Sequence, residues 1–282
     1  MRLGTLRNSS TGTTVAVRID GTDDIVEIPG FADVGALLGT ADWRVVARDA
    51  DGPRHAAVEP SSWAPPVLRP SKIVCVGLNY RNHILEMGRE LPEYPTLFAK
   101  FPEALIGPFD PIVLPPHAGD AVDWEAEVAV VIGATARRVP EAEAGAAIAG
   151  FAVLNDVTMR DYQYRTTQWF QGKTFEATTP FGPWLTVSED GSPPGGASEM
   201  RTEIDGEIMQ RTPVDDMVFG PAALVSYISH IIALQPGDVI ATGTPGGVGH
   251  ARKPARYLEP GQSLVTSVTG LGELRNEIVA EV

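Results

Sequence analysis

The segment 123–133, DWEAEVAVVIG, limits the possible folds of this chain more than any other stretch. Its run of Ala, Val and Ile predicts a strand, in which successive side chains point to opposite faces. Trp124 then shares one face with the apolar residues at every second position after it. Glu125 and Glu127 share the other face, which continues into alanine and valine and so does not stay polar. The predicted strand therefore carries two carboxylates into an apolar layer.

Two carboxylates side by side in an apolar layer repel each other and lose their hydration, unless a cation lies between them. Oxygen ligands suit a hard cation such as Mg²⁺, Mn²⁺ or Ca²⁺. Asp156, which follows the apolar run 151–155, is a third candidate ligand. Asp161 is a rival to it, unless it forms an ion pair with its neighbour Arg160. The alternative is that both glutamates lie on a solvated strand end.

The N-terminal part of the sequence has a different pattern from the rest. Strands are expected at 14–18 and 25–28, joined as a hairpin, with one short helix over 31–38. Prolines at positions 60, 65, 66 and 70 then interrupt any regular helix or central strand. We therefore expect a small N-terminal domain over residues 1–69 and a larger domain over residues 70–282.

The larger domain is expected to contain many strands and few helices. This balance predicts a mostly β architecture with helical insertions, an α+β fold. Pro221 is placed to start the last helix, and Pro236-Gly237 to stop it. Strands are expected at 72–77, 124–133, 150–154, 182–187, 201–204, 238–242 and 263–268, and helices at 80–87, 141–148 and 222–234.

Charge and cysteine content exclude several classes of function. With 22 Lys and Arg residues against 36 Asp and Glu, the net charge of −14 repels phosphate backbones and anionic lipid headgroups. We expect no nucleic acid and no membrane as partner, and an anionic substrate would need a local cation. Cys75 is the only cysteine, so no intramolecular disulfide and no multi-thiolate zinc site can form. Nothing resembles a signal peptide, which predicts a cytoplasmic protein.

Several common catalytic motifs are missing from the sequence. It has no GxSxG, no Walker loop, no GxGxxG and no HExxH. The glycine-rich segment 242–249, TGTPGGVG, does follow a predicted strand. Its backbone N–H groups could hold a carboxylate, or the segment could be a plain turn.

Two further groups of residues are candidates for catalysis. Asn79 is expected to cap the helix 80–87, on which His83 and Glu86 are three residues apart and share a face. The carboxylate can orient the imidazole and raise its basicity, which gives a general base for water, although such pairs on surface helices often have no catalytic role. Lys173 lies among aromatic residues in WFQGKTF. There it could be buried beside a developing oxyanion or extend its ammonium group into water.

Five separated motifs in order closely resemble the fumarylacetoacetate hydrolase superfamily, from about residue 70 to the C-terminus. They are VGLNY at 76–80 with His83 and Glu86, DWEAE at 123–127, LNDVT at 154–158 with Arg160, Asp161 and Gln163, GKTF at 172–175, and PGD at 236–238 with TGTP at 242–245. The resemblance implies a mixed β-roll or flattened barrel that forms a homodimer, preceded by a small, variable N-terminal domain.

The resemblance also implies a role for each site residue. It implies one Mg²⁺ or Mn²⁺ per subunit, with Ca²⁺ as a further option, held by Glu125, Glu127 and Asp156, and a small anionic 2-oxo acid as substrate. The other residues implied are His83 with Glu86 as the base on a lid-like helix, Lys173 as the electrophilic cation, Gln163 placing water or substrate, and Thr244, Gly243 and Arg81 binding substrate.

The activity implied by the resemblance is hydrolysis of a carbon–carbon bond in a 2,4-dioxo acid, of the acylpyruvate or fumarylpyruvate type. In such a reaction water would attack the C4 carbonyl and the C3–C4 bond would break to leave a pyruvate enolate, for which a metal ion would supply Lewis-acid stabilisation. An oxaloacetate decarboxylase is an alternative because it forms the same enolate, and a 2-hydroxydienoate hydratase or isomerase of aromatic catabolism is another. The non-enzymatic alternative is an inactive scaffold of the same fold, although the intact set of acids, base and lysine argues against it.

Overall fold

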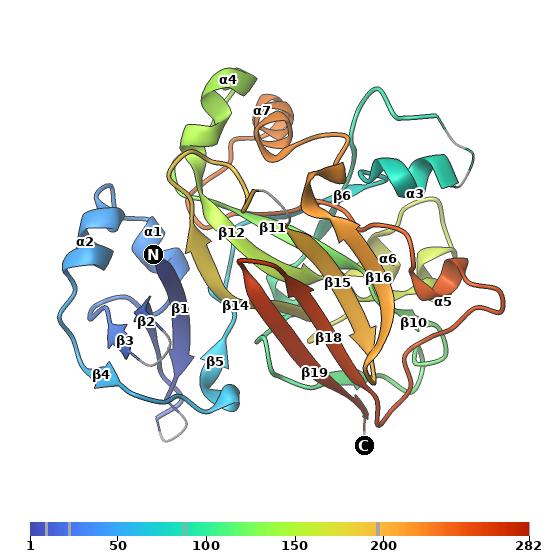
Figure 1. The fold of residues 1–282 in the computed structure, drawn as a ribbon, viewed down its shortest axis with the longest axis horizontal. Coiled ribbons are helices and arrows are strands. Elements are labelled where there is room, and N and C mark those ends of the chain that lie inside the picture. Colours follow the sequence, from blue (N-terminus) through green and yellow to red (C-terminus); the bar gives the residue numbers. More distant parts are fainter. Residues whose placement is uncertain (9–10, 22–23, 87, 89, 196–197, 282) are drawn as a thin grey trace.

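Two sheets dominate the fold of the chain in this computed structural model (Figure 1). The structure describes residues 1–8, 11–21, 24–86, 88, 90–195 and 198–281, without the side chains of His83 and Glu86. The larger sheet has twelve strands. Ten of them lie side by side in the order β4 (Arg54–His55), β3 (Asp24–Glu27), β2 (Thr14–Asp20), β1 (Arg2–Arg7), β14 (Thr179–Val187), β12 (Ile148–Asn155), β11 (Ala126–Ile132), β17 (Val239–Ala241), β6 (Ile73–Gly77) and β7 (Thr96–Lys100), while β5 (Trp63–Ala64) pairs with β1 and β8 (Leu105–Ile106) with β14.

The second sheet has five strands and packs against the first. Its order is β16 (Glu207–Pro213), β15 (Glu199–Ile204), β18 (Ser263–Val268), β19 (Gly272–Ala280) and β9 (Ile112–Leu114), and a separate pair joins β10 (Val122–Asp123) to β13 (Thr158–Met159). Strands β11 and β12 contact β18 of this sheet. The mostly β, α+β fold expected from the sequence is therefore confirmed.

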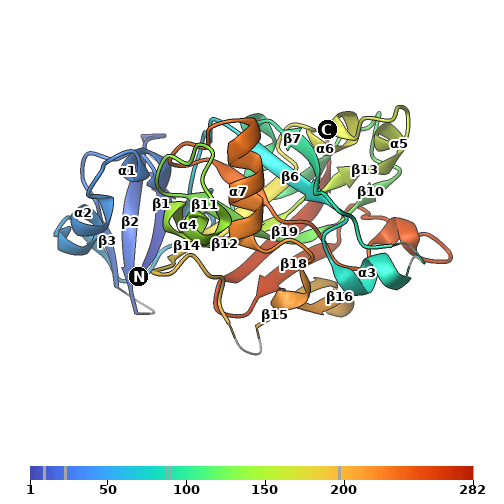
Figure 2. The same cartoon turned by 90° about the horizontal axis from the view of Figure 1, so that it is seen from above.

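The helices of the described residues are short and lie around the sheets. Helices α4 and α7 contact each other (Figure 2), and α7 begins at Pro221 as expected. No helix in this part of the chain is long and apolar enough to cross a membrane. The α-helices are α1 (Val34–Leu38), α2 (Trp43–Asp49), α3 (Arg81–Glu86), α4 (Glu141–Ala144), α5 (Arg160–Gln163), α6 (Phe170–Lys173) and α7 (Pro221–Ile231), with 3₁₀ turns η1 (Pro60–Ser62), η2 (Pro102–Ala104), η3 (Gly145–Ala147), η4 (Val214–Asp216) and η5 (Gly249–Ala251).

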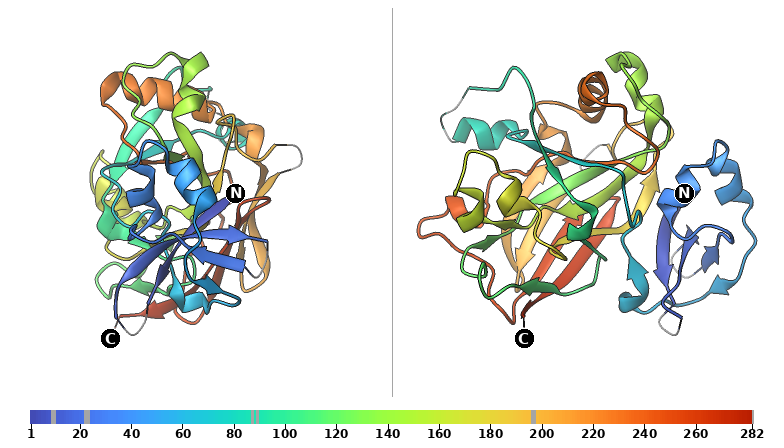
Figure 3. Two further views of the ribbon diagram at one scale, coloured as in Figure 1. Left: turned by 90° about the vertical axis from the view of Figure 1, so that its left-hand side faces the viewer. Right: turned by 180° about the vertical axis from the view of Figure 1, so that it is seen from behind.

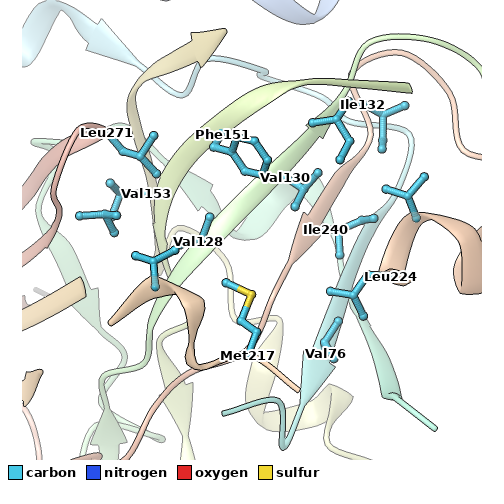
Figure 4. Packing of buried hydrophobic residues seen from close by; sticks show 14 of the residues in the cluster. Val76, Val128, Val130, Ile132, Phe151, Val153, Met217, Leu224, Ile240 and Leu271 are labelled. Atoms are coloured by element: carbon cyan, nitrogen blue, oxygen red, sulfur yellow. The ribbon is translucent and has the colours of Figure 1, made fainter. Parts of the chain in front are cut away.

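Strand β11 is buried on both faces, because it lies in the middle of the larger sheet. Its side chains at 126, 128, 130 and 132 pack with Phe151 and Val153 in one cluster, which also includes residues of β15, β18 and β19 (Figure 4). Those at 129 and 131 belong to a second cluster on the opposite face, together with Leu37 and Trp43 of α1 and α2. The predicted alternation is thus present over β11, with apolar layers on both sides, but Trp124 precedes the strand and packs in a separate cluster with Val122 and Met159.

The N-terminal strands are part of the larger sheet. Strand β1 pairs antiparallel with β14, with Leu3 opposite Leu185, and β2 and β3 form the expected hairpin. Figures 1 and 3 show these elements at one end of the molecule and α3 at the other. The domain boundary at residue 70 stays a prediction.

Two local expectations were wrong. The helix expected over 141–148 ends at Ala144, a 3₁₀ turn follows, and Ile148 already pairs with Ile132 in the sheet. Asn79 does not cap α3, because its buried side-chain oxygen accepts from the Phe219 N–H at 2.8 Å, while its amide nitrogen donates to the carbonyls of Thr242 and Phe219.

Helix α3 instead receives its cap from a distant residue. Asp216 accepts a hydrogen bond from the backbone N–H of Asn82 at 3.0 Å. The helix lies within the expected range, of which Met87 is outside the described residues. The start of α3 is therefore tied to η4, which packs beside it.

We expect Phe151→Ala to destabilise the fold by about 3–5 kcal/mol, because it removes a ring that is 1% exposed between the sheets. Ile231→Ala, at a position that is 65% exposed on α7, should change stability by less than about 0.5 kcal/mol. Urea unfolding followed by circular dichroism measures both. Equal effects of the two substitutions would contradict this description of the core.

Candidate active site

Antiparallel pairing of β11 with β12 brings three carboxylates together. Ala126 lies opposite Asn155, so the start of β11 meets the end of β12, and the Asp156 N–H donates to the Glu125 carbonyl at 2.8 Å. Glu125, Glu127 and Asp156 each place a carboxylate oxygen within 4.8 Å of the others, and all three residues are buried. The structure thus unites the three acids that the sequence singled out, and neither glutamate lies on a solvated strand end.

Two buried lysines bind this carboxylate cluster. Lys173 Nζ lies 2.6 Å from Glu125 Oε2 and 2.8 Å from Asp156 Oδ2. Lys100 Nζ lies 2.6 Å from Asp156 Oδ1. With exposures of 2% and 1%, neither ammonium group extends into water. Of the two interpretations of Lys173, the buried one therefore holds.

A buried arginine holds the other side of the cluster. Arg160 Nη2 lies 2.7 Å from Asp123 Oδ2 and 2.7 Å from Glu125 Oε1. The prediction of an ion pair between Arg160 and Asp161 was wrong, because the Arg160 guanidinium points inward. Asp161 Oδ2 lies 3.7 Å from Arg165 Nη2 instead. Asp161 is exposed and does not belong to the cluster in the described structure.

Glu127 is the member of the cluster without an ion-pair partner among the described residues. Its Oε2 accepts a hydrogen bond from the Gly243 N–H at 2.7 Å. Residue 243 has to be glycine, because its φ is +100° and a Cβ would lie 2.9 Å from the Val76 carbonyl oxygen. Burial, followed by the charges of Asp156 and Glu125, raises the pKa of Glu127 well above its usual value. A cation beside Glu127 would therefore be strongly favourable.

Asp156 and Lys173 keep their charges within the cluster. Burial acts to raise the pKa of Asp156, but Lys100 and Lys173 outweigh it and the pKa is lowered. Burial likewise acts to lower the pKa of Lys173, but Asp156 and Glu125 outweigh it and the pKa is raised. The centre thus contains both an ionised carboxylate and a fixed ammonium group.

A cavity of about 400 Å³ opens beside the cluster. Phe98 and Trp169 meet edge to face in its wall, with ring centroids 5.5 Å apart, and Lys173 Nζ lies 5.2 Å from the Phe98 ring centre. This size suits a small organic ligand. The lining includes Glu125, Arg160, Gln163, Tyr164, Lys173, Thr244 and His250.

Hydrogen bonds fix which polar atoms remain free for a ligand. Gln210 Oε1 accepts from Thr202 and from the Ala126 N–H, so Gln210 Nε2 must donate to Thr244 Oγ1, at 2.9 Å. Thr244 is therefore free to donate its own hydroxyl proton. Gln163 Oε1 accepts from Arg160 at 2.8 Å, which leaves the amide nitrogen of Gln163 available in the same way.

The three acids fit a divalent metal ion. All their donor atoms are carboxylate oxygens, which is the set that Mg²⁺, Mn²⁺ and Ca²⁺ prefer. Glu127 in particular is buried among like charges, where a cation would compensate its charge. Which metal binds stays a prediction.

Not every predicted site residue lies in the described cavity. Helix α3 is present, so His83 and Glu86 share one face of it, but their side chains lie outside the described part of the structure. Arg81 is exposed and does not line the cavity. Gly243 binds Glu127 through its N–H, as described above.

Local sequence pattern assigned no role to several residues of the site. Lys100 is the last residue of the edge strand β7, and the sequence around it shows only a short apolar run before it, which does not indicate a role in the site. Asp123, Asn155 and Gln210 hold the cluster in place; Asn155 accepts from the Glu125 N–H at 2.9 Å. His250 directly follows the glycine-rich segment 242–249, of which only the backbone N–H groups were expected to bind a ligand.

The comparisons with known proteins agree on the family. The model described as fumarylacetoacetate (FAA) hydrolase C-terminal matches residues 72–279. A mitochondrial oxaloacetate tautomerase from Rattus norvegicus is 40% identical over 215 residues, which are 76% of this chain and 68% of that protein. The chain belongs to the fumarylacetoacetate hydrolase family, as the sequence motifs indicated.

Two solved structures share the whole fold. A fumarylacetoacetate hydrolase from the psychrophilic Exiguobacterium antarcticum is 30% identical with a TM-score of 0.86, and 100% of each chain is covered. A 5-carboxymethyl-2-hydroxymuconate delta-isomerase from Mycobacterium smegmatis is 34% identical with a TM-score of 0.79, again over 100% of both chains. Because the family includes relatives named as mitochondrial, the cytoplasmic location stays a prediction, as does the homodimer.

We expect Glu127→Gln to weaken Mn²⁺ binding by at least about 100-fold, because it removes a charged ligand from the cluster. Isothermal titration calorimetry on the metal-free protein measures this. Asp161→Asn is the matched control, since that exposed carboxylate lies outside the cluster. Unchanged Mn²⁺ affinity in Glu127→Gln would contradict the assignment of the site.

Proposed function

We propose that this protein catalyses the metal-assisted enolisation of a short 2-oxo dicarboxylic acid, with keto–enol tautomerisation of oxaloacetate as its reaction. The observation that carries this proposal is the Lys173 ammonium group, buried between Glu125 and Asp156 in the wall of the cavity. The name of the rat relative, an oxaloacetate tautomerase, supports this choice of substrate.

Enolisation removes a proton from C3 and places negative charge on the oxygen at C2, and that oxygen then takes a proton from solvent to give the enol. A metal ion held by Glu125, Glu127 and Asp156 would act there as a Lewis acid for the carboxylate and 2-oxo group of the substrate. Lys173 adds a hydrogen-bond donor with a fixed charge, and its raised pKa keeps that charge in place. The developing enolate would therefore be stabilised without rearrangement of the protein.

The remaining groups would orient the substrate and accept its proton. Thr244 has a free hydroxyl proton for the substrate carboxylate, and Gln163 has a free amide donor. We assign removal of the C3 proton to His83, oriented by Glu86, because the two share a face of α3. Tautomerisation needs no attacking water and breaks no carbon–carbon bond. It therefore requires fewer catalytic steps from these residues than hydrolysis does.

Hydrolysis of an acylpyruvate or fumarylpyruvate is the second candidate. The fold-wide similarity to a fumarylacetoacetate hydrolase favours it, and a cavity of about 400 Å³ leaves room for a substrate longer than oxaloacetate. His83 would then activate water, and the same cations would stabilise the pyruvate enolate that leaves.

Decarboxylation of oxaloacetate and isomerisation of a hydroxydienoate share this enolate chemistry. An inactive scaffold is the non-enzymatic alternative.

The products distinguish these reactions. We expect the protein to speed the interconversion of enol and keto oxaloacetate, with Mg²⁺ or Mn²⁺ and not with EDTA, without releasing pyruvate or CO₂. Pyruvate together with a second acid from acylpyruvates would instead identify a hydrolase, and pyruvate with equal CO₂ a decarboxylase. Metal binding without turnover of any of these substrates would favour the scaffold.

Lys173→Met should lower kcat for tautomerisation by about 10²–10³-fold, because it removes a preorganised donor to the enolate oxygen. Lys253→Met is the matched control, since Lys253 is exposed and does not line the cavity. Stopped-flow absorbance of the enol measures both variants. A Lys173→Met variant that folds and retains full kcat would refute the role given to this lysine.

A further inference from the structure

His250 lies in the wall of the active-site cavity, in a loop whose backbone is fixed. The backbone N–H of His250 donates to Asp123 Oδ2 at 3.0 Å, and the backbone N–H of Gly249 donates to Asp123 Oδ1 at 2.6 Å. Residue 249 has no room for a side chain, because a Cβ would overlap the Arg256 carbonyl oxygen. The loop is thus attached to the same carboxylate that binds Arg160.

The imidazole ring of His250 is held by two tyrosines. It stacks at a tilt against Tyr164, with ring centroids 5.0 Å apart, and its Nδ1 lies 2.9 Å from the Tyr257 hydroxyl. The other ring nitrogen, Nε2, has no partner among the described residues. His250 therefore presents an oriented ring with one unused nitrogen.

The other cationic groups of the cavity wall already have partners. Lys173 binds Glu125 and Asp156, and Arg160 binds Asp123, Glu125 and Gln163. These contacts balance the charge of the carboxylates around them. Within the described wall, His250 is the basic side chain with a nitrogen that no protein group contacts, in addition to the Lys173 ammonium group that the proposed function places at the enolate oxygen.

We propose that His250 determines specificity by donating a hydrogen bond from Nε2 to the second carboxylate of a 2-oxo dicarboxylate. Tyr257 donates to Nδ1 and thereby keeps the imidazole proton on Nε2, which makes it a positioning residue. The inference rests on the proposed function, because it assumes that the 2-oxo acid end of the substrate lies at the carboxylate cluster.

The surroundings of Tyr257 fit this direction of hydrogen bonding. Burial, together with the charge of Asp123, raises the pKa of Tyr257, so the phenol keeps its proton and can donate it to His250. The protein carries a net charge of −14, so a dianionic substrate needs a specific donor at each end. His250 would supply the donor at the end away from the metal ligands.

The test compares oxaloacetate with 2-oxobutanoate, which has a methyl group in place of the second carboxylate. Exchange of C3 protons for deuterium, followed by proton NMR with saturating Mg²⁺, reports enolisation of both. We expect His250→Ala to lower the ratio of kcat/KM for oxaloacetate to that for 2-oxobutanoate by about 10- to 100-fold, mainly through KM. His250→Gln retains an N–H donor and should restore most of the ratio, and Tyr257→Phe should lower it by less than His250→Ala.

Exposed His230 on α7 provides the control, because it does not line this cavity and His230→Ala should leave the ratio unchanged. An unchanged ratio in His250→Ala, or an equal loss for both substrates, would overturn the inference. Wild-type protein that exchanges neither substrate would contradict the proposed function. Calorimetric binding of the two acids then decides the role of His250 separately: a preference for oxaloacetate that disappears in His250→Ala supports it, and equal affinities in wild-type protein overturn it.

Discussion

The burial of three carboxylates within 4.8 Å of one another is the constraint on which this structure depends. Each of them loses its hydration, and each repels the other two. Lys100, Lys173 and Arg160 offset much of this cost through ion pairs of 2.6–2.8 Å. Glu127 has no such partner in the described structure, and a divalent cation would complete the balance of charge.

The fold maintains this arrangement through rigid elements. Glu127 belongs to β11 and Asp156 follows β12, two central strands whose side chains are buried on both faces. The lysines come from other places, with Lys100 at the end of edge strand β7 and Lys173 at the end of α6. Packing of the large sheet thus stabilises the fold and sets the distances between opposite charges.

The sequence predicted the parts of the site that depend on local pattern. The alternation in 123–133 placed Glu125 and Glu127 on one face, and the apolar run before Asp156 marked the end of a neighbouring strand. It did not predict Lys100, because β7 reaches the cluster through pairing with β6 at the far side of the sheet. Arg160 was assigned to the wrong partner and Asn79 to the wrong role, since both bind residues distant in the sequence. Contacts of this kind follow from tertiary packing, which local spacing does not encode.

The central claim is that the carboxylate cluster holds a metal ion that activates a 2-oxo acid. A crystal structure with Mn²⁺ and oxalate, which resembles the carboxylate and 2-oxo end of such an acid, tests it most directly. The account predicts an anomalous scattering peak coordinated by oxygens of Glu125, Glu127 and Asp156, with oxalate bound to the same ion. A structure in which Mn²⁺ binds elsewhere, and in which these three carboxylates contact only the lysines, Arg160 and the Gly243 N–H, would contradict it.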